Sequence, residues 1–120
     1  MTILATGAAR FIGAAVSRAL LARGEQVVGV DNLNDYNEVS LKQSRLDTLT
    51  CNSRADISDR DAILRLADEF GGITDLIHLA AQAGVRYSLV NPYAYVTANV
   101  MGQVVMLEMA QQLPKLQHFV

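Results

Sequence analysis

The sequence predicts an α/β domain built on a doubly wound parallel sheet, and two observations lead to that prediction. Across its 120 residues, short apolar runs that are typical of strands covered on both faces alternate with segments of helical period. A glycine-rich turn separates the first apolar run from the first helical segment. Because crossovers between parallel strands are right-handed, this alternation places helices on both faces of one sheet.

The first expected unit is a strand, a turn and a helix. Residues 2–6 form an apolar and β-branched run that ends at Gly7. In residues 10–23 apolar side chains recur at helical spacing, and Gly24 then ends the helix. The apolar residues 27–30 follow as a second buried strand.

The middle of the chain is more polar. Residues 31–37 have the composition of a loop, and residues 39–49 predict a polar helix. A weak third strand is expected around Cys51. The following helix has a clear buried stripe, with Ser58 as its expected N-cap and Gly71 at its end.

The last third predicts a strand, a loop, a long helix and the start of another strand. Residues 76–79 form the fourth apolar run, residues 80–90 are expected to be a loop, and Asn91 caps a helix that continues to about residue 112. Residues 117–120 resemble the beginning of a fifth strand, where the sequence stops. We therefore expect the domain to be truncated at that strand.

Composition and charge restrict the classes of function. A hydrophobic share of 51% fits one compact soluble domain, and ten Lys plus Arg against twelve Asp plus Glu leave no basic field for nucleic acid. No apolar run approaches the ~18 residues of a membrane span, and no export signal is visible. The single Cys51 can form neither an internal disulfide nor a metal site alone. We expect a cytoplasmic protein with no metal, nucleic-acid or membrane partner.

The first turn is the strongest candidate for a functional site. It reads Thr-Gly-Ala-Ala-Arg-Phe-Ile-Gly over residues 6–13, where Gly7 allows a tight turn and Gly13 lets the helix approach the strand. Backbone N–H groups and the helix dipole bind a pyrophosphate at such a position. Asp31 follows Gly7 by 24 positions, close to the spacing of about 20 for a carboxylate that accepts ribose hydroxyls. The pattern predicts dinucleotide binding.

These motifs resemble the extended short-chain dehydrogenase/reductases, which are NAD-dependent epimerases and dehydratases with the turn T-G-x-x-G-F-I-G. The resemblance covers the whole chain and is strongest to the UDP-glucuronate 4-epimerase subfamily. The segments that carry it are residues 30–36, 41–46, 55–59, 78–88 and 91–95, with Asn99 and Gly102. It implies that residues 1–120 are the N-terminal part of a Rossmann-type NAD-binding domain. It also implies that NAD takes a hydride from C4 of a sugar nucleotide and returns it to the opposite face.

The resemblance assigns a place to each part of the cofactor. The expected residues are Gly7, Phe11, Ile12 and Gly13 for the pyrophosphate, Asp31 and Asn32 for the adenosine ribose, Asp56 and Ile57 for the adenine, and Leu79, Ala80 and Ala81 for the ribose on the nicotinamide side. Arg86 is expected to face an anionic sugar nucleotide. Purely structural roles stay open for Asp56, for residues 79–81 and for Arg86.

Arg10 stands where the family has the middle glycine of its turn. That glycine lets the backbone approach the pyrophosphate, so Arg10→Gly is expected to tighten NAD binding. Alternatively, the guanidinium pairs with a phosphate, as an arginine does in NADP-binding relatives. Asp31 opposes NADP by charge repulsion, which makes NAD the expected cofactor.

The catalytic Tyr-x-x-x-Lys pair of the family is absent from this sequence. Its lysines, Lys42 and Lys115, are preceded four positions earlier by Glu38 and Gln111. We therefore expect no catalytic residue in this chain, with the C-terminal catalytic and substrate-binding part of the domain absent. In the intact protein that part would bind the nucleotide sugar.

The long helix that begins at Pro92 has a wide apolar surface, which by resemblance would form a homodimer interface; burial within one chain is the alternative. The expected function is the NAD-binding portion of a nucleotide-sugar epimerase, with UDP-glucuronate as its substrate. Two alternatives remain. One is a non-catalytic nucleotide-binding or interaction module, and the other is the N-terminal part of a sugar-nucleotide dehydratase or decarboxylase.

Overall fold

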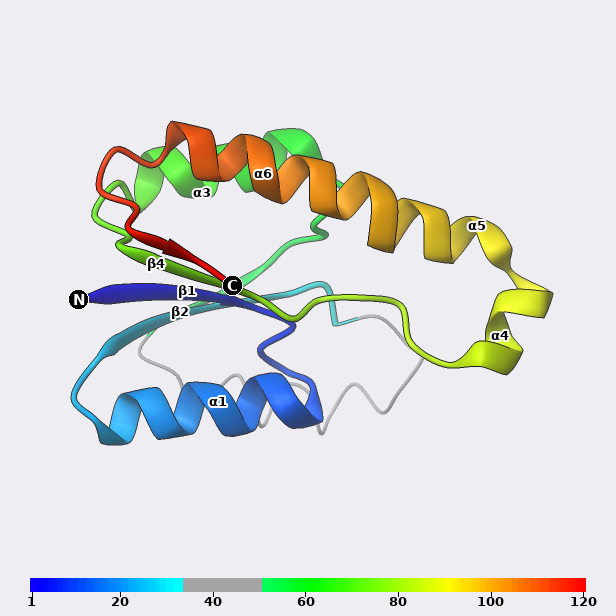
Figure 1. Ribbon diagram of the computed structural model, residues 1–120, viewed down its shortest axis with the longest axis horizontal. Coiled ribbons are helices and arrows are strands. Elements are labelled where there is room, and N and C mark those ends of the chain that lie inside the picture. Colours follow the sequence, from blue (N-terminus) through cyan, green and yellow to red (C-terminus); the bar gives the residue numbers. More distant parts are fainter. Residues whose placement is uncertain (34–50) are drawn as a thin grey trace.

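A computed structural model describes residues 1–33 and 51–120 of the chain. In that part, five parallel strands form one sheet in the order β3-β2-β1-β4-β5, with helices on both faces (Figure 1). The strands are β1 (Thr2–Thr6), β2 (Gln26–Asp31), β3 (Cys51–Arg54), β4 (Asp75–His78) and β5 (His118–Phe119). The predicted doubly wound α/β fold is confirmed, whereas the polar helix expected over residues 39–49 lies outside the described residues.

The strand order reverses at the centre of the sheet. The chain first moves outward from β1 to β2 and β3, and it then returns to the other side of β1 with β4 and β5. Thr6, the last residue of β1, is paired with Val30 of β2 and with His78 of β4. In open parallel sheets the crevice beyond the carboxyl ends of the strands at such a reversal is where ligands bind.

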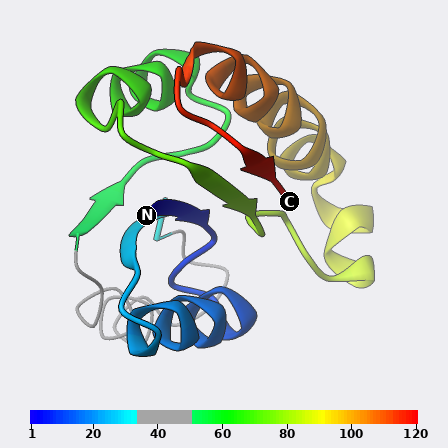
Figure 2. The ribbon, with the colours of Figure 1, turned by 60° about the vertical axis from the view of Figure 1, so that its left-hand side comes forward.

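The helices form a layer on each face of the sheet, as Figure 2 shows. Helix α1 (Phe11–Ala22) covers one face, and α3 (Arg60–Glu69) and α6 (Gly102–Gln112) cover the other. Three shorter segments precede α6, and they are α4 (Val85–Val90), α5 (Pro92–Tyr95) and the π-helical segment η1 (Val96–Met101). Figure 1 shows α4 and α5 projecting beyond the carboxyl ends of the strands.

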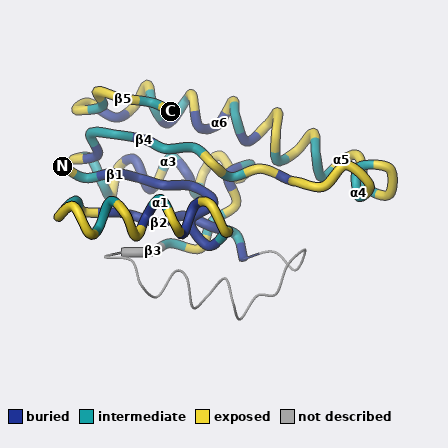
Figure 3. The backbone as a smooth tube through the Cα atoms, turned by 60° about the horizontal axis from the view of Figure 1, so that its bottom comes forward, coloured by how far each residue is buried: buried dark blue, intermediate teal, exposed yellow. Residues whose placement is uncertain are grey.

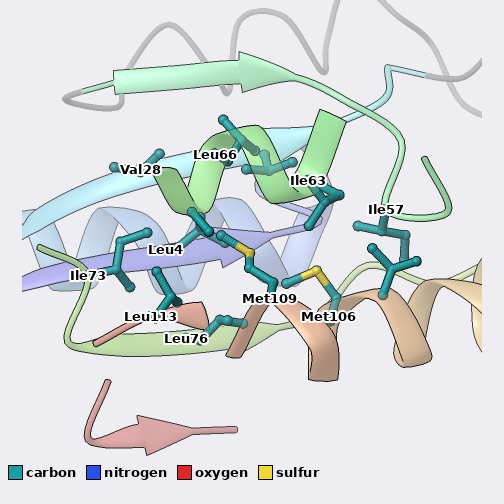
Figure 4. Packing of buried hydrophobic residues seen from close by; sticks show 13 residues of the cluster. Leu4, Val28, Ile57, Ile63, Leu66, Ile73, Leu76, Met106, Met109 and Leu113 are labelled. Atoms are coloured by element: carbon teal, nitrogen blue, oxygen red, sulfur yellow. The ribbon is translucent and has the colours of Figure 1, made fainter. Parts of the chain in front are cut away.

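Two apolar clusters hold these layers together, and they differ in the size of their side chains. Under α3 and α6, large aliphatic residues and methionines interdigitate with the sheet, as Figure 4 shows for Leu4, Val28, Ile63, Leu76, Met106 and Met109. Under α1 the cluster consists mainly of small residues, namely Ala5, Ala8, Ala9, Val27 and Leu33. The small side chains let α1 lie close to the sheet, and β1 between the two clusters is buried almost throughout (Figure 3).

Three local predictions require correction. Asp59, not Ser58, is the N-cap of α3, because its carboxylate accepts the Ala62 N–H at 3.2 Å. Ser58 instead donates its hydroxyl to Asp56 at 2.7 Å, so a neighbouring carboxylate competes successfully for it. Within the expected loop of residues 80–90, residues 85–90 form the short helix α4. The expected helix over residues 91–112 is helical but contains the π-helical segment η1.

Candidate functional site

A cavity of about 330 Å³ lies where the carboxyl ends of the strands meet the start of the long helix. Its lining comes from five separate stretches of chain: the first turn, the end of β2, the segment after β3, the segment after β4, and the helices α5 and η1. The lining residues are Arg10, Val30, Asp31, Asn32, Ala55, Asp56, Ile57, Ser58, Ala80, Ala81, Gln82, Asn91, Tyr93, Ala94, Thr97 and Ala98. The cavity therefore occupies the crevice that the strand order predicts.

The glycines of the first turn sit at two tight backbone contacts beside the cavity. Gly7 has φ +68°, and a Cβ there would lie 3.0 Å from the backbone of Leu79 and Ala80. A Cβ on Gly13 would lie 2.0 Å from the carbonyl oxygen of Gly7. Both positions therefore require glycine, one because the turn presses against the end of β4 and the other because α1 presses against the turn.

Thr6 connects the ends of the two central strands through its hydroxyl, which sequence analysis did not single out. Its Oγ1 accepts the N–H groups of Leu79 and Ala80, each at 3.1 Å, and lies 2.7 Å from Nδ1 of His78. Because both lone pairs of the hydroxyl are used by these N–H groups, its proton is left for Nδ1 of the imidazole. This arrangement requires a neutral His78 with its proton on Nε2, and burial lowers the pKa of that imidazole from 6.5.

Asp31 holds the first turn to the end of β2. Its side chain is 5% exposed, Oδ2 accepts the Ala9 N–H at 3.2 Å, and Oδ1 accepts the Leu33 N–H at 2.8 Å. A carboxylate has about four lone-pair sites, so two remain for hydroxyl groups of a ligand. Asp31 therefore holds the first turn to β2, and it is also one of the residues that line the cavity.

Arg10 is the N-cap residue of α1, and its backbone is extended, with φ −85° and ψ 169°. Any residue adopts this conformation, so the turn does not need glycine there on conformational grounds. Its N–H donates to the carbonyl of Gly7 at 3.0 Å, while its side chain lines the cavity. The helix has no side-chain cap and no acidic residue in its first turn.

The segment after β3 forms a second wall of the cavity. Asp56 folds it into a tight turn, because its Oδ1 accepts both the N–H of Ser58 at 2.9 Å and its hydroxyl. Ile57 is 7% exposed and belongs to the core under α6. A Cβ on Gly102 would lie only 2.5 Å from Cδ1 of Ile57, so the glycine leaves the notch in α6 that receives this side chain.

Asn99 and Gln82 form a contact that sequence analysis missed. The side-chain Oδ1 of Asn99 accepts the Gln82 N–H at 2.8 Å, and its Nδ2 donates to the Gln82 carbonyl at 3.3 Å. Asn99 lies in η1, and single π-helical turns of this kind are frequent at functional sites. The amide thus holds the segment after β4 against the long helix, with Gln82 itself 9% exposed.

The structure brings most of the expected cofactor residues together. Seven of them line the cavity, and they are Arg10, Asp31, Asn32, Asp56, Ile57, Ala80 and Ala81. The others lie outside its lining: Gly7 and Gly13 form the packed turn, Leu79 follows β4, and Phe11 and Ile12 are 78% and 64% exposed at the start of α1. Arg86 lies on α4, exposed and also outside the lining.

Within residues 1–33 and 51–120, three or more His, Cys, Asp or Glu side chains do not gather in a group that could hold a metal ion. None of the helices described is long and apolar enough to cross a membrane. The cavity at the carboxyl ends of the strands is the candidate site because it lies where the strand order reverses.

Residues 3–120 match the model of the NAD dependent epimerase/dehydratase family. The chain belongs to this family. It is 44% identical over 117 residues to UDP-glucuronate 4-epimerase 4 of Arabidopsis thaliana. The aligned region covers 94% of this chain and 26% of that protein. The chain thus spans about a quarter of the length of this relative.

Solved structures of epimerases have the same fold. The UDP-glucose 4-epimerase of Thermotoga maritima with UDP-glucose has a TM-score of 0.87 and 31% identity, over 99% of this chain and 36% of that one. The UDP-glucuronic acid 4-epimerase of Bacillus cereus in complex with NAD has a TM-score of 0.76 and 31% identity. This match covers 99% of the present chain and 38% of the Bacillus chain. Membership of the epimerase/dehydratase family confirms the resemblance and agrees with NAD as the expected cofactor.

The buried imidazole of His78 should make stability depend on pH. Its pKa in the fold lies below 6.5, so the unfolded chain binds a proton first as the pH falls. The free energy of unfolding should therefore decrease as the pH drops below about 6.5. The variant His78→Asn keeps an acceptor for Thr6, and its free energy of unfolding, measured with urea, should no longer show the decrease that His78 causes at low pH. The exposed control His118→Asn should still show that decrease. An equal pH slope in the wild type and in His78→Asn contradicts the assignment.

Removing the Asn99 amide should release the segment after β4. In Asn99→Ala the Gln82 N–H loses its acceptor, which costs about 1–3 kcal/mol for a buried donor. Amide hydrogen exchange at Gln82 should become faster than in the wild type. The matched control is Asn91→Ala, which removes an acceptor from Ala94 at the start of α5 and should leave exchange at Gln82 unchanged. Unaltered exchange at Gln82 in Asn99→Ala shows that the contact does not hold this segment.

Proposed function

We propose that this chain is the NAD-binding portion of a nucleotide-sugar 4-epimerase that acts on UDP-glucuronate. One observation carries the proposal: Arg10 of the first turn and the carboxylate-bearing Asp31 line one cavity where the strand order reverses, and α1, which has no side-chain cap, begins at the next residue. The names of the similar proteins support a sugar nucleotide as the substrate.

The start of α1 would bind the pyrophosphate. Without a side-chain cap, the N–H groups of the first turn, including those of Phe11 and Ile12, are available to phosphate oxygens. The helix dipole adds partial positive charge at the same place. The side chains of Phe11 and Ile12 are largely exposed, and the proposed contact uses only their backbone N–H groups.

The adenosine would lie along the ends of β2 and β3. Asp31 and Asn32 offer oxygen acceptors for the ribose hydroxyls, and the turn at Asp56 forms the wall against which the adenine would rest. The side chain of Ile57 is packed into the core, so mainly its backbone would face the base. The tight turn that Asp56 makes with Ser58 fixes the position of this wall.

The nicotinamide half would lie beside Leu79, Ala80 and Ala81. The small side chains of Ala80 and Ala81 leave room in the cavity next to the end of β4, and Asn99 keeps the following residue, Gln82, in place. A bound NAD would supply the hydride acceptor and donor for C4 of the sugar. The contribution of this chain is to orient the cofactor and to exclude water at that edge of the sheet.

Acid–base catalysis would come from outside these 120 residues. The Tyr-x-x-x-Lys pair does not occur in the sequence, and the similar plant epimerase is about four times as long as the matched part. We therefore propose that residues 1–120 are the N-terminal part of the Rossmann domain and that the catalytic and substrate-binding part lies elsewhere. Arg86, exposed on α4, would face the anionic sugar nucleotide in the complete site.

The outer face of the long helix supports a homodimer as part of the proposal. Its apolar stripe is about half exposed or more, with Val96 at 60%, Val100 at 58%, Val104 at 55% and Leu107 at 49%. In the part of the chain that the structure describes, these side chains are not covered, and a second copy would cover them. Nucleic acid and membrane are not among the proposed partners, and a single cysteine fits a reducing cytoplasm.

Thermal unfolding with added ligands tests the proposal. A dinucleotide at about 100 times its Kd should stabilise the fold by about 2.7 kcal/mol, so NAD should raise the melting temperature. Asp31→Ala should reduce the NAD-induced rise, and Asp68→Ala, an exposed acidic residue on α3, should leave it unchanged. Absence of any rise with NAD or NADP contradicts NAD binding and leaves the non-catalytic interaction module as the better hypothesis.

A further inference from the structure

Gln82 is a nearly buried polar residue among those that line the cavity. It is 9% exposed, and its Nε2 donates to the Ala83 carbonyl at 3.5 Å, which is longer than the usual N–H···O range of about 2.7–3.2 Å. That carbonyl also accepts the Tyr95 hydroxyl at 3.0 Å, so it keeps a donor when Nε2 turns to another acceptor. Within the part of the chain that the structure describes, the carboxamide of Gln82 is therefore weakly engaged.

The side-chain oxygen of Gln82, Oε1, makes no hydrogen bond with any described residue. Among residues 1–33 and 51–120, the only enclosed side-chain oxygen or nitrogen without a hydrogen-bond partner is Oγ of Ser17. Oε1 is therefore not enclosed, and the open space that Gln82 lines is the cavity. A buried amide with an unused acceptor at a cavity offers a hydrogen bond to a ligand.

The backbone of Gln82 is held by Asn99, which fixes the point from which the side chain starts. Asn99 accepts the Gln82 N–H at 2.8 Å and donates to its carbonyl at 3.3 Å. Small residues share the cavity lining with it: Ala80 and Ala81 precede it in the chain, and Ala98 lies on η1. A carboxamide on a fixed backbone loses little freedom when it binds a ligand, so the contact is preorganised.

The place of Gln82 in the lining indicates which part of a dinucleotide it meets. The nicotinamide half is proposed to lie beside Ala80 and Ala81, and Gln82 is the next residue of the same wall. The ribose of that half has two neighbouring hydroxyls, and each of them can donate and accept. Because Oε1 accepts and Nε2 donates, one carboxamide can bind both hydroxyls of such a diol.

We propose that the carboxamide of Gln82 binds the 2′- and 3′-hydroxyls of the ribose on the nicotinamide side. The proposal rests on the proposed dinucleotide site and deepens it, because it adds a residue that positions the hydride-carrying half of the cofactor. In the complex Oε1 gains the donor that it lacks among the described residues, and Nε2 exchanges its long bond to Ala83 for a hydroxyl oxygen. Gln82 then holds this ribose at the end of β4, while Asp31 holds the other ribose at the end of β2.

Calorimetric titration of ADP, ADP-ribose and NAD into the wild type, Gln82→Met and Gln82→Glu tests the proposal. ADP lacks the second ribose and ADP-ribose has it without the nicotinamide, so the ratio of their Kd values isolates the ribose contact. Gln82→Met removes two hydrogen bonds at similar side-chain length, and it should weaken ADP-ribose and NAD by roughly tenfold each and ADP by less than about twofold. Gln82→Glu keeps acceptors for both hydroxyls and should lose less affinity than Gln82→Met. The matched control Gln111→Met, an exposed glutamine on α6, should change none of the three Kd values.

The three ligands also separate the results that overturn the proposal. An equal loss for all of them means that Gln82 acts on the shared part of the ligands or on the fold. A loss for NAD without a loss for ADP-ribose means that the amide binds the nicotinamide ring, and unchanged Kd values for both mean that it binds neither group. Each of these results contradicts the ribose contact and leaves dinucleotide binding intact. Failure of the wild type to bind any of the three contradicts the proposed function itself, and this inference with it.

Discussion

The close contact between the end of β1 and the end of β4 is the constraint on which the rest of the site depends. At Gly7 the backbone turns with a positive φ, and the backbone of Leu79 and Ala80 leaves no space for a side chain. The hydroxyl of Thr6 fastens the same two strands by accepting both of the N–H groups that follow β4. Because α1 starts from this turn, its position and the position of its positive end are determined by the contact.

Each further wall of the cavity is held by a separate interaction. Asp31 joins the turn to the end of β2, Ile57 fits the notch that Gly102 leaves in α6, and Asn99 holds the segment at Gln82. These contacts come from strands and helices that are packed into two different apolar clusters, one on each face of the sheet. The cavity is therefore built from fixed elements rather than from one loop, which favours a preformed binding site.

The sequence predicted those features that local chemistry decides. Apolar runs predicted the buried strands β1, β2 and β4, helical spacing predicted α1, and the need for glycine predicted the turn between β1 and α1. Seven of the residues expected near the cofactor line one cavity. Features decided by tertiary contacts were harder to predict. Ser58 has the chemistry of an N-cap, but Asp56 engages its hydroxyl and Asp59 takes the capping role. The contact of Asn99 with Gln82 depends on the π-helical turn, and no repeating pattern of apolar residues in the sequence marks such a turn.

The central claim is that the cavity at the carboxyl ends of the strands holds a dinucleotide. Amide chemical shifts of the ¹⁵N-labelled chain, followed during a titration with NAD, test it most directly. The account predicts shifts concentrated at residues 7–13, 31–32, 56–58 and 80–82, with little change near Gly71 and Gly72 at the opposite end of the sheet. Shifts centred on Gly71 and Gly72, or no shifts at all at saturating NAD, would contradict it.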